Sequence, residues 1–265
     1  MPELAEVEVV RRNLETWWKG RRASEVRLLD EDLLKKGSPG DLKVALSKPL
    51  ERPARRGKYL ICHLEGEQSV VFHFRMTGKI ICCERPDPKY ARLSWRIDDL
   101  GWLVFKDQRR LGSAHLFATR ELDDYEPLQK MGPEPEDLTV HHLREVCSDR
   151  RMLKTALLDQ SIAAGVGNIA ISELFWRLKF APDVKCGQLS DDDFERLIDE
   201  MPRYFDEIID RSMADEVMYV EEEEMDNIFA VYRRAGQDCP RCGATIEKRR
   251  VGGRSSFYCP RCQAR

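Results

Sequence analysis

Two features are missing from the sequence: a long apolar run and a strong excess of positive charge. Every apolar run is well short of the 18 or so residues that a transmembrane helix requires. The sequence also has no internal repeat, and the acidic run from Glu221 to Glu224 is its one low-complexity tract. The formal net charge of −3 argues weakly against a nucleic-acid partner. We therefore expect a cytoplasmic protein with no secretion signal and no membrane partner.

The charge is distributed unevenly along the chain. With 42% hydrophobic and 34% charged residues, the composition is that of a globular protein, and 265 residues suffice for one large or two modest domains. Acidic runs lie at Asp191–Asp193 and Glu221–Glu224, where solvated surfaces are the ordinary interpretation. The last 25 residues, by contrast, hold one acid and seven basic residues: Arg241, Lys248, Arg249, Arg250, Arg254, Arg261 and Arg265.

Hydrophobic periodicity changes near the middle of the chain. Before residue 132, short segments alternate apolar and polar residues, which predicts the strands of a β-sandwich or barrel-like domain. After the GPEPED stretch, which is typical of a linker, the period becomes helical. One helical segment opens with Ser190, and Ser190 together with Asp193 predicts an N-terminal capping box there. The predicted strands span residues 58–64, 69–75, 92–98 and 102–107.

The first residues predict a helix with an unusual start. Val7, Val10, Leu14 and Trp17 recur at the spacing of a buried helical stripe. Pro2 is compatible with a helix start, which is the ordinary explanation for it. If Met1 is removed, however, Pro2 becomes a terminal secondary amine and therefore a nucleophile.

Cysteine spacing predicts a metal site near the end of the chain. Two Cys-Pro-Arg-Cys motifs are separated by 16 residues, which is the pattern of a tetrahedral Cys₄ zinc site with no open position. We therefore expect one structural Zn²⁺ per chain, with the remaining five cysteines serving as packing residues. The four predicted ligands are Cys239, Cys242, Cys259 and Cys262.

Two further turns are candidates for anion contact. Gly252 and Gly253 predict a hairpin turn between the cysteine pairs, and Arg254 lies at this turn. Asn168 follows a glycine turn between two helical segments, where helix N–H groups would face an anion. The alternatives are a solvated surface arginine and a helical hairpin without a ligand.

Taken together and in this order, the motifs resemble the Fpg/Nei family of bifunctional DNA glycosylases over nearly the whole chain. The start MPELAEVE is similar to the family's Pro-Glu-Leu-Pro-Glu-Val-Glu, with Ala5 in place of a proline. The stretches RRGKYL, HFRMTG, DQRRLG and GVGN and the zinc hairpin complete the set. Glu6 and Glu173 also match family acids, although a helix-end charge and a solvated helix face remain alternatives for them.

The resemblance implies an α+β multidomain fold. It predicts a catalytic β-sandwich domain with an N-terminal helix over residues 1–131 and a linker over 132–138. A helix-two-turn-helix DNA-binding domain is expected over 139–235 and a Cys₄ zinc hairpin over 236–265. The implied partner is damaged double-stranded DNA, bound by a nucleoid-associated monomer.

The resemblance also implies roles for individual residues. Pro2 would attack the sugar and form a Schiff base that proceeds through β,δ-elimination, with Glu3 as acid/base and Lys58 on a phosphate. The remaining residues would bind DNA: Met76, Arg109 and Leu111 in the gap left by the flipped base, and Asn168 and Arg254 on flanking phosphates. From the sequence alone, core packing is the favoured alternative for Met76 and Leu111.

One stretch departs from the family pattern. Between the helical segment and the zinc hairpin, the expected long lesion-covering loop is replaced by a short acidic segment. This argues against 8-oxoguanine as the preferred lesion and leaves a ring-opened purine, an oxidised pyrimidine, an abasic site or a bulkier adduct. Two other functions stay open: a non-catalytic protein that binds DNA damage or structure, and a zinc-dependent module that binds protein.

Overall fold

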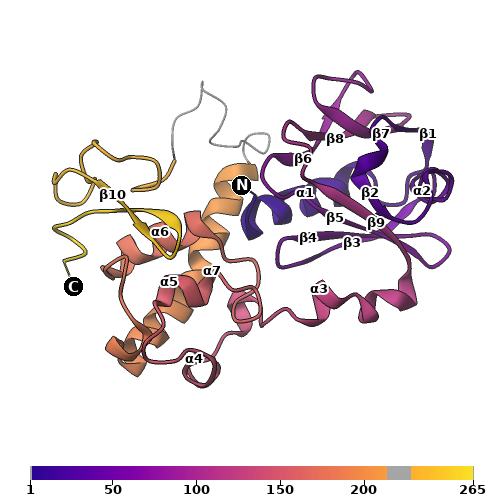
Figure 1. Cartoon of the computed structure of the whole chain (residues 1–265). Helices are drawn as coiled ribbons and strands as arrows, with labels where there is room; N and C mark the ends of the chain where they lie inside the picture. The colour runs from indigo at the N-terminus through magenta and orange to yellow at the C-terminus, as the bar shows by residue number, and fades with distance from the viewer. Residues whose placement is uncertain (1, 214–227, 265) are drawn as a thin grey trace. The chain divides into compact units, whose positions relative to one another are not determined.

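The computed structural model describes residues 2–213 and 228–264 and divides the chain into two compact units (Figure 1). The first unit comprises the chain up to Gln129 together with the end of helix α7 (Asp191–Met213), from Ile209 on. The second comprises Lys130 to Ile208 and the C-terminal segment. The acidic run Glu221–Glu224 and the shortened loop lie outside the described residues.

The first unit opens with helix α1, Leu4–Trp17. Val7, Val10 and Leu14 are fully buried, as their spacing predicts. The prediction for Trp17 is wrong, because Trp18 is the buried tryptophan. The reason is that Trp18, four residues after Leu14, still donates its N–H to the Leu14 carbonyl at 3.0 Å and so continues the buried stripe. Its ring packs with its centroid 5.3 Å from that of Trp95.

Two sheets form the body of the first unit. One has four strands in the order β1-β7-β8-β6: β1 Ala23–Leu28, β7 Ala91–Ile97, β8 Gly101–Asp107 and β6 Gly78–Cys83. The other has five in the order β2-β9-β5-β4-β3: β2 Leu34–Lys36, β9 Ser113–Ala118, β5 Gln68–His73, β4 Tyr59–Leu64 and β3 Leu50–Arg56. Between β1 and β3 the chain also forms η1 Glu31–Leu33 and α2 Pro39–Leu46.

Aromatic residues form the core between the two sheets. The Phe72 ring of β5 stacks on Trp95 of β7 at 6.3 Å and on Phe105 of β8 at 5.7 Å. These contacts join one sheet to the other and confirm the predicted β-sandwich. The opposite face of β5 is also covered, since Val71 packs with Leu122 of η2 (Thr119–Asp124), which α3 (Glu126–Gln129) follows.

The second unit is helical and ends in a hairpin. Ser190 and Asp193 form the predicted capping box, because each backbone N–H donates to the other's side chain, at 3.1 and 3.2 Å. Helix α7 then continues through Pro202. The elements of this unit are η3 Pro135–Asp137, α4 Val140–Val146, α5 Leu153–Leu157, α6 Asn168–Leu178, η4 Cys186–Gln188, α7 Asp191–Met213, β10 Glu247–Val251 and β11 Arg254–Tyr258.

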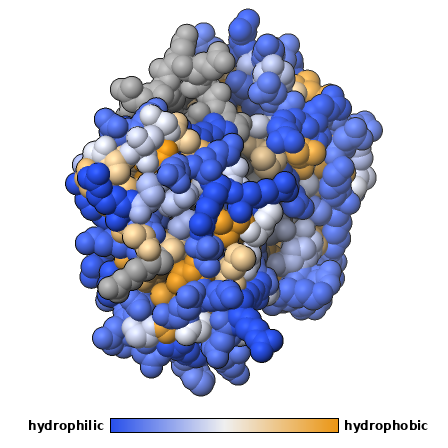
Figure 2. Space-filling view, turned by 60° about the vertical axis from the view of Figure 1, so that its left-hand side comes forward, coloured by the Kyte–Doolittle hydropathy of each residue, from blue (hydrophilic) through white to orange (hydrophobic). Residues whose placement is uncertain are grey.

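Most of the face drawn in Figure 2 is hydrophilic, with small apolar areas between the charged side chains. Within the described ranges, the helices are too short or too polar for any of them to cross a membrane.

Candidate nucleic-acid interface and zinc centre

Pro2 and Glu3 lie directly before α1, and both are buried. Glu3 is the N-cap residue, and its backbone N–H donates to the Glu6 Oε2 atom at 2.8 Å. Burial, together with the neighbouring Glu3, raises the pKa of the Glu6 carboxyl. Glu6 thus closes the capping box of α1, as its helix-end alternative predicts, and also places a second acid beside the Pro2–Glu3 pair.

Lys58 lies in the turn between β3 and β4, and this turn is tied to α1. Arg55 of β3 donates from Nη1 to the Gly57 carbonyl at 3.2 Å, and its Nε lies 3.4 Å from Glu8 Oε2. Burial opposes ionisation of Glu8, but hydrogen bonds from Arg11 and another arginine outweigh it, and the pKa of Glu8 is lowered. The Lys58 turn and the helix that follows Pro2 are thus held by one ion-pair network.

His73, at the end of β5, is a residue of this region that the sequence analysis did not single out. Burial and the nearby positive charges of Arg75 and Lys58 lower its pKa to about 3. The Arg75 backbone N–H donates to His73 Nδ1 at 3.0 Å, which leaves the proton of the neutral ring on Nε2. The available signal in the sequence was its position in the HFRMTG motif; in the sheet, His73 pairs with Tyr59, the residue after Lys58.

The structure brings together the two loops that carry Met76, Arg109 and Leu111. We call these loops, residues 74–78 and 107–112, the wedge loops. The Arg109 backbone N–H donates to the Thr77 side-chain oxygen at 3.0 Å, which links the two loops. Met76 is partly buried, Arg109 is exposed, and Leu111 has 47% of its surface exposed. The core-packing alternative for Leu111 is therefore wrong.

Asn168 begins α6, as the glycine turn predicts. The Gln160 side chain holds this turn, because its amide nitrogen donates to the Val166 carbonyl and its oxygen accepts the Gly165 N–H, both at 3.0 Å. The Asn168 Oδ1 atom is buried and has no hydrogen-bond partner among the described residues. Asn168 stands at the N-terminal end of α6, where the positive end of the helix dipole favours an anion.

Arg254 is exposed and lies at the turn of the β10–β11 hairpin. The hairpin is fixed to α5 by Lys154, which is 1% exposed and donates to the Ser255 carbonyl at 3.1 Å and the Ser256 hydroxyl at 2.6 Å. A Cβ on Gly252 would lie 2.4 Å from Thr155, so the turn approaches α5 too closely for a larger residue. The hairpin that carries Arg254 is thus held against α5 and α6, the second of which begins at Asn168.

Glu173 of α6 is buried rather than solvated. Its carboxylate accepts three consecutive backbone N–H groups, from Ala230 at 2.8 Å and from Val231 and Tyr232 at 2.9 Å. Burial raises the pKa of this carboxyl, and the three N–H donors oppose that change without cancelling it. Glu173 therefore organises the segment that leads to the zinc hairpin, so the alternative of a solvated helix face is wrong.

The four predicted cysteines form a metal centre. Their Sγ atoms all lie within 4.8 Å of one another. The four residues are Cys239, Cys242, Cys259 and Cys262. Four converging thiols, with no fifth ligand in their group among the residues that the structure describes, fit a closed tetrahedral Zn²⁺ site. The Trp176 indole N–H donates to Cys239 Sγ at 3.4 Å and so connects the centre to α6.

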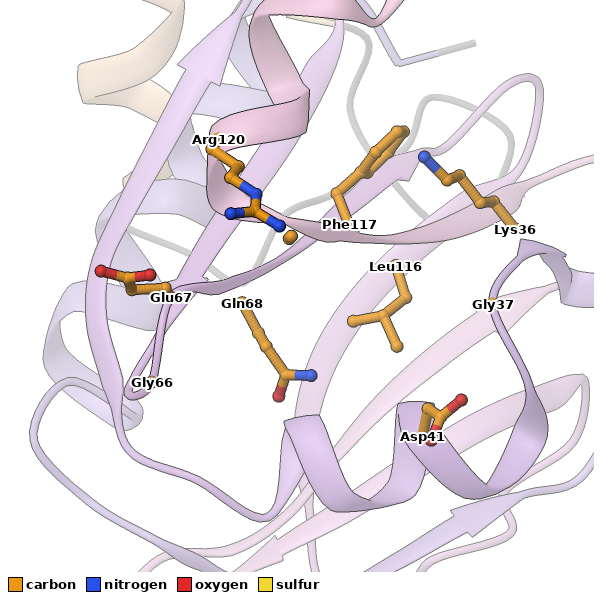
Figure 3. A pocket seen from close by; sticks show the side chains of 10 residues that line it. Lys36, Gly37, Asp41, Gly66, Glu67, Gln68, Leu116, Phe117 and Arg120 are labelled. Carbon is orange, nitrogen blue, oxygen red and sulfur yellow. The ribbon is translucent and has the colours of Figure 1, made fainter.

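A cavity of about 450 Å³ lies elsewhere in the first unit, beside α2 and β9 (Figure 3). Lys36, Asp41, Gln68, Phe117 and Arg120 are among its lining residues. Its charges are already balanced in part, since the Lys36 ammonium pairs at 3.0 Å with a glutamate and lies over the Phe117 ring. None of the predicted site residues is among those that line this cavity.

Three family models cover most of the sequence. They are the formamidopyrimidine-DNA glycosylase N-terminal domain over residues 1–114, its H2TH domain over 131–218, and the zinc finger found in FPG and IleRS over 236–265. A formamidopyrimidine-DNA glycosylase of Streptococcus mutans is 34% identical over 272 residues, covering 99% of both chains. The chain belongs to the formamidopyrimidine-DNA glycosylase family. The Bacillus subtilis enzyme of that name is also 34% identical, over the full length of both chains.

Solved structures of the formamidopyrimidine-DNA glycosylase family share this fold. The Lactococcus lactis enzyme in complex with DNA containing Fapy-dG has a TM-score of 0.86 at 30% identity, covering 99% of this chain and all of the other. The same enzyme with DNA containing an abasic site has a TM-score of 0.87 at 31% identity, with the same coverage. The family's zinc finger and the four converging thiols together confirm one structural zinc in this chain.

Proposed function

We propose that this chain is a bifunctional base-excision-repair enzyme, which removes damaged bases from double-stranded DNA and then cleaves the strand as an AP lyase. The observation that carries the proposal is the buried Pro2–Glu3 pair at the start of α1, with Glu6 hydrogen-bonded to Glu3. Membership of a glycosylase family whose solved members hold damaged DNA supports it. We assign catalysis to residues 1–131, which a linker over 132–138 joins to DNA-binding parts over 139–235 and 236–265.

The first step requires a free Pro2 nitrogen. Removal of Met1 leaves a terminal amine of pKa near ~8, so a useful neutral fraction exists at physiological pH. This nitrogen attacks C1′ of the damaged nucleotide, an N–C1′ bond forms, and the glycosidic bond breaks. The base departs with the bonding electrons and takes a proton from water. Glu3 accepts the Pro2 N–H proton and delivers one to O4′ as the sugar ring opens, which leaves a C1′ iminium.

The iminium then acidifies the sugar. Loss of the C2′ proton expels the 3′ phosphate, and loss of the C4′ proton expels the 5′ phosphate. Water hydrolyses the iminium and restores Pro2. In this scheme Lys58 holds a phosphate and assists elimination, while the zinc maintains the hairpin and takes no part in the chemistry.

The remaining predicted residues would hold the DNA. Asn168 and Arg254 would contact the phosphates that flank the lesion, which fixes the strand without reading its sequence. The wedge loops would fill the gap that the flipped nucleotide leaves in the duplex. A ring-opened purine is the first lesion to test, because a solved relative is bound to DNA containing Fapy-dG.

Borohydride trapping tests the covalent step. We expect the parent, shown by mass spectrometry to begin at Pro2, to form a reducible adduct with duplex DNA containing an abasic site. An added alanine before Pro2 places the nitrogen in an amide and should abolish the adduct. Glu3→Gln should slow base excision by about 100-fold or more. Pro39→Gly is the matched control, since Pro39 also lies at a helix start, that of α2. Absence of an adduct from the parent would leave a non-catalytic DNA-binding protein.

A further inference from the structure

Arg92 of β7 is a charged side chain enclosed in the first unit, with 2% of its surface exposed. Its guanidinium lies between two carboxylates. Nε donates to Asp30 Oδ2 at 2.6 Å, and Nη1 lies 3.6 Å from Asp107 Oδ2. Both acids are themselves buried, with 8% and 0% of their side chains exposed. The reaction proposed above uses none of these three groups.

Asp107 closes the second wedge loop from inside. Its carboxylate accepts the Gly112 N–H at 2.6 Å and the Arg109 N–H at 3.2 Å, so it holds both ends of the loop. Arg92 adds a third point, because Nη1 donates to the Gly112 carbonyl at 3.0 Å. A Cβ on Gly112 would lie 2.8 Å from the Phe105 ring, so the backbone here fits against the core only as glycine.

The same carboxylate reaches the first wedge loop. The Thr77 hydroxyl donates to Asp107 Oδ1 and accepts the Arg109 N–H at 3.0 Å. The Gly78 N–H donates to the Phe74 carbonyl at 2.9 Å, which closes that loop across Met76. A shift of Asp107 would therefore move both loops together.

Asp30 extends the cluster to the exposed end of the second loop. Its Oδ1 atom lies 2.9 Å from Arg110 Nη2, while its Oδ2 atom faces Arg92. Arg110 has a φ of 54°, a left-handed conformation that costs energy in a non-glycine residue. The two arginines and two aspartates balance in charge, which is the condition under which buried charges persist.

We propose that Arg92 is a positioning residue, which holds the wedge loops in the conformation needed to enter DNA. This inference rests on the proposed function and names a residue that acts through the loops without touching the substrate. An apolar side chain would fill the core at this position, but only a guanidinium spans Asp30, Asp107 and the Gly112 carbonyl at once. Exposed side chains that must enter a duplex need a fixed backbone beneath them, since small displacements cost large factors in rate.

Arg92→Lys tests the inference, because lysine keeps the charge but cannot span three acceptors. Arg96→Lys is the matched control, since Arg96 lies on the same strand with 51% of its side chain exposed. Two substrates are compared under single-turnover conditions: a duplex with a ring-opened purine and 2-aminopurine opposite the neighbouring base, and a single strand with an abasic site. We expect the rate of base excision from the duplex and the change in 2-aminopurine fluorescence each to fall at least tenfold. Cleavage of the single strand should stay within about twofold of the parent.

Equal losses on both substrates, or no loss on the duplex, would overturn the positioning role. If Arg92→Lys does not fold, Thr77→Val removes the link between the loops with little change of volume, and the same split between substrates is expected. Failure of the parent to form a borohydride adduct would instead refute the proposed function. The 2-aminopurine signal would still show whether the loops enter the duplex, and so keeps the two failures distinct.

Discussion

The Glu173 carboxylate accepts the backbone N–H of Val231 at 2.9 Å across 58 residues of sequence. Two further N–H groups, from the residues on either side, bind the same carboxylate. A single side chain of α6 thereby supplies the acceptors for three consecutive N–H groups of a segment that belongs to none of the described helices or strands. Because charge-assisted hydrogen bonds are strong where water is excluded, this contact fixes the approach to the zinc hairpin.

Glu173→Gln should therefore destabilise the protein. Glutamine offers one acceptor oxygen and turns an N–H₂ group towards backbone N–H donors, so at least one donor is left unsatisfied. We expect a loss of about 1–3 kcal/mol and a fall in Tm of roughly 2–10 °C, measured by calorimetry on the zinc-loaded protein. The control is Glu195→Gln, at an exposed position of α7. Equal Tm values for the two variants would contradict the prediction.

Removal of zinc should be visible in tryptophan fluorescence. Trp176 is hydrogen-bonded to Cys239, and the other four tryptophans precede residue 130. A chelator should release the thiol cluster, expose the Trp176 indole and shift its emission to longer wavelength, with loss of salt-sensitive DNA binding. Trp176→Phe should abolish the emission shift, and Trp17→Phe should retain it. A shift that persists in Trp176→Phe would show that the metal is not coupled to α6 in this way.

Leu111→Ala should affect DNA without affecting the fold. The side chain is 47% exposed, so truncation leaves no internal cavity and should change stability by about 0.5 kcal/mol or less. If Leu111 enters the duplex, excision from a lesion-containing duplex should fall by up to about tenfold, because an apolar contact of about 1.4 kcal/mol is lost. Val44→Ala, at a 59% exposed position of α2, is the control. Matching rates for both variants in a single-turnover assay would exclude Leu111 from the gap.

Local signals in the sequence predicted much of this structure. The cysteine spacing, the Gly252–Gly253 turn and the Ser190 cap each depend on residues close together in the chain, and the structure confirms all three. Alternation likewise located β4, β5, β7 and β8. The four-part division of the chain stays a prediction, as do the roles of the individual site residues.

Contacts between distant segments were beyond the reach of the sequence. In the alternating segment 92–98, Arg92 and Trp95 point to opposite faces, yet both side chains are buried. Burial of the arginine is tolerated because Asp30 and Asp107, from other parts of the chain, pair with it. From the sequence, a solvated helix face was an alternative for Glu173. The structure buries it, because the segment at Val231 packs on it and donates backbone N–H groups to its carboxylate. Such charged residues have no local signature, since a partner far along the chain determines whether burial is tolerated.

His73 should make the first unit sensitive to acid. Its pKa is lowered to about 3, first by burial and then by Arg75 and Lys58, whereas an unfolded histidine titrates near ~6.5. Below about pH 6.5 the unfolded chain therefore takes up a proton that the folded chain refuses. The stability contribution is fully present above pH ~6.5 and is lost as the pH falls towards 3, at no more than about 1.4 kcal/mol per pH unit.

His73→Gln should remove this part of the slope of stability against pH, and His141→Gln, at an exposed position, should keep it. Stability is measured by urea unfolding at about pH 7, 6 and 5. Unfolding is monitored by the fluorescence emission of the tryptophans in the first unit. Parallel slopes for the parent and His73→Gln would show that the folded protein accepts the proton at this ring.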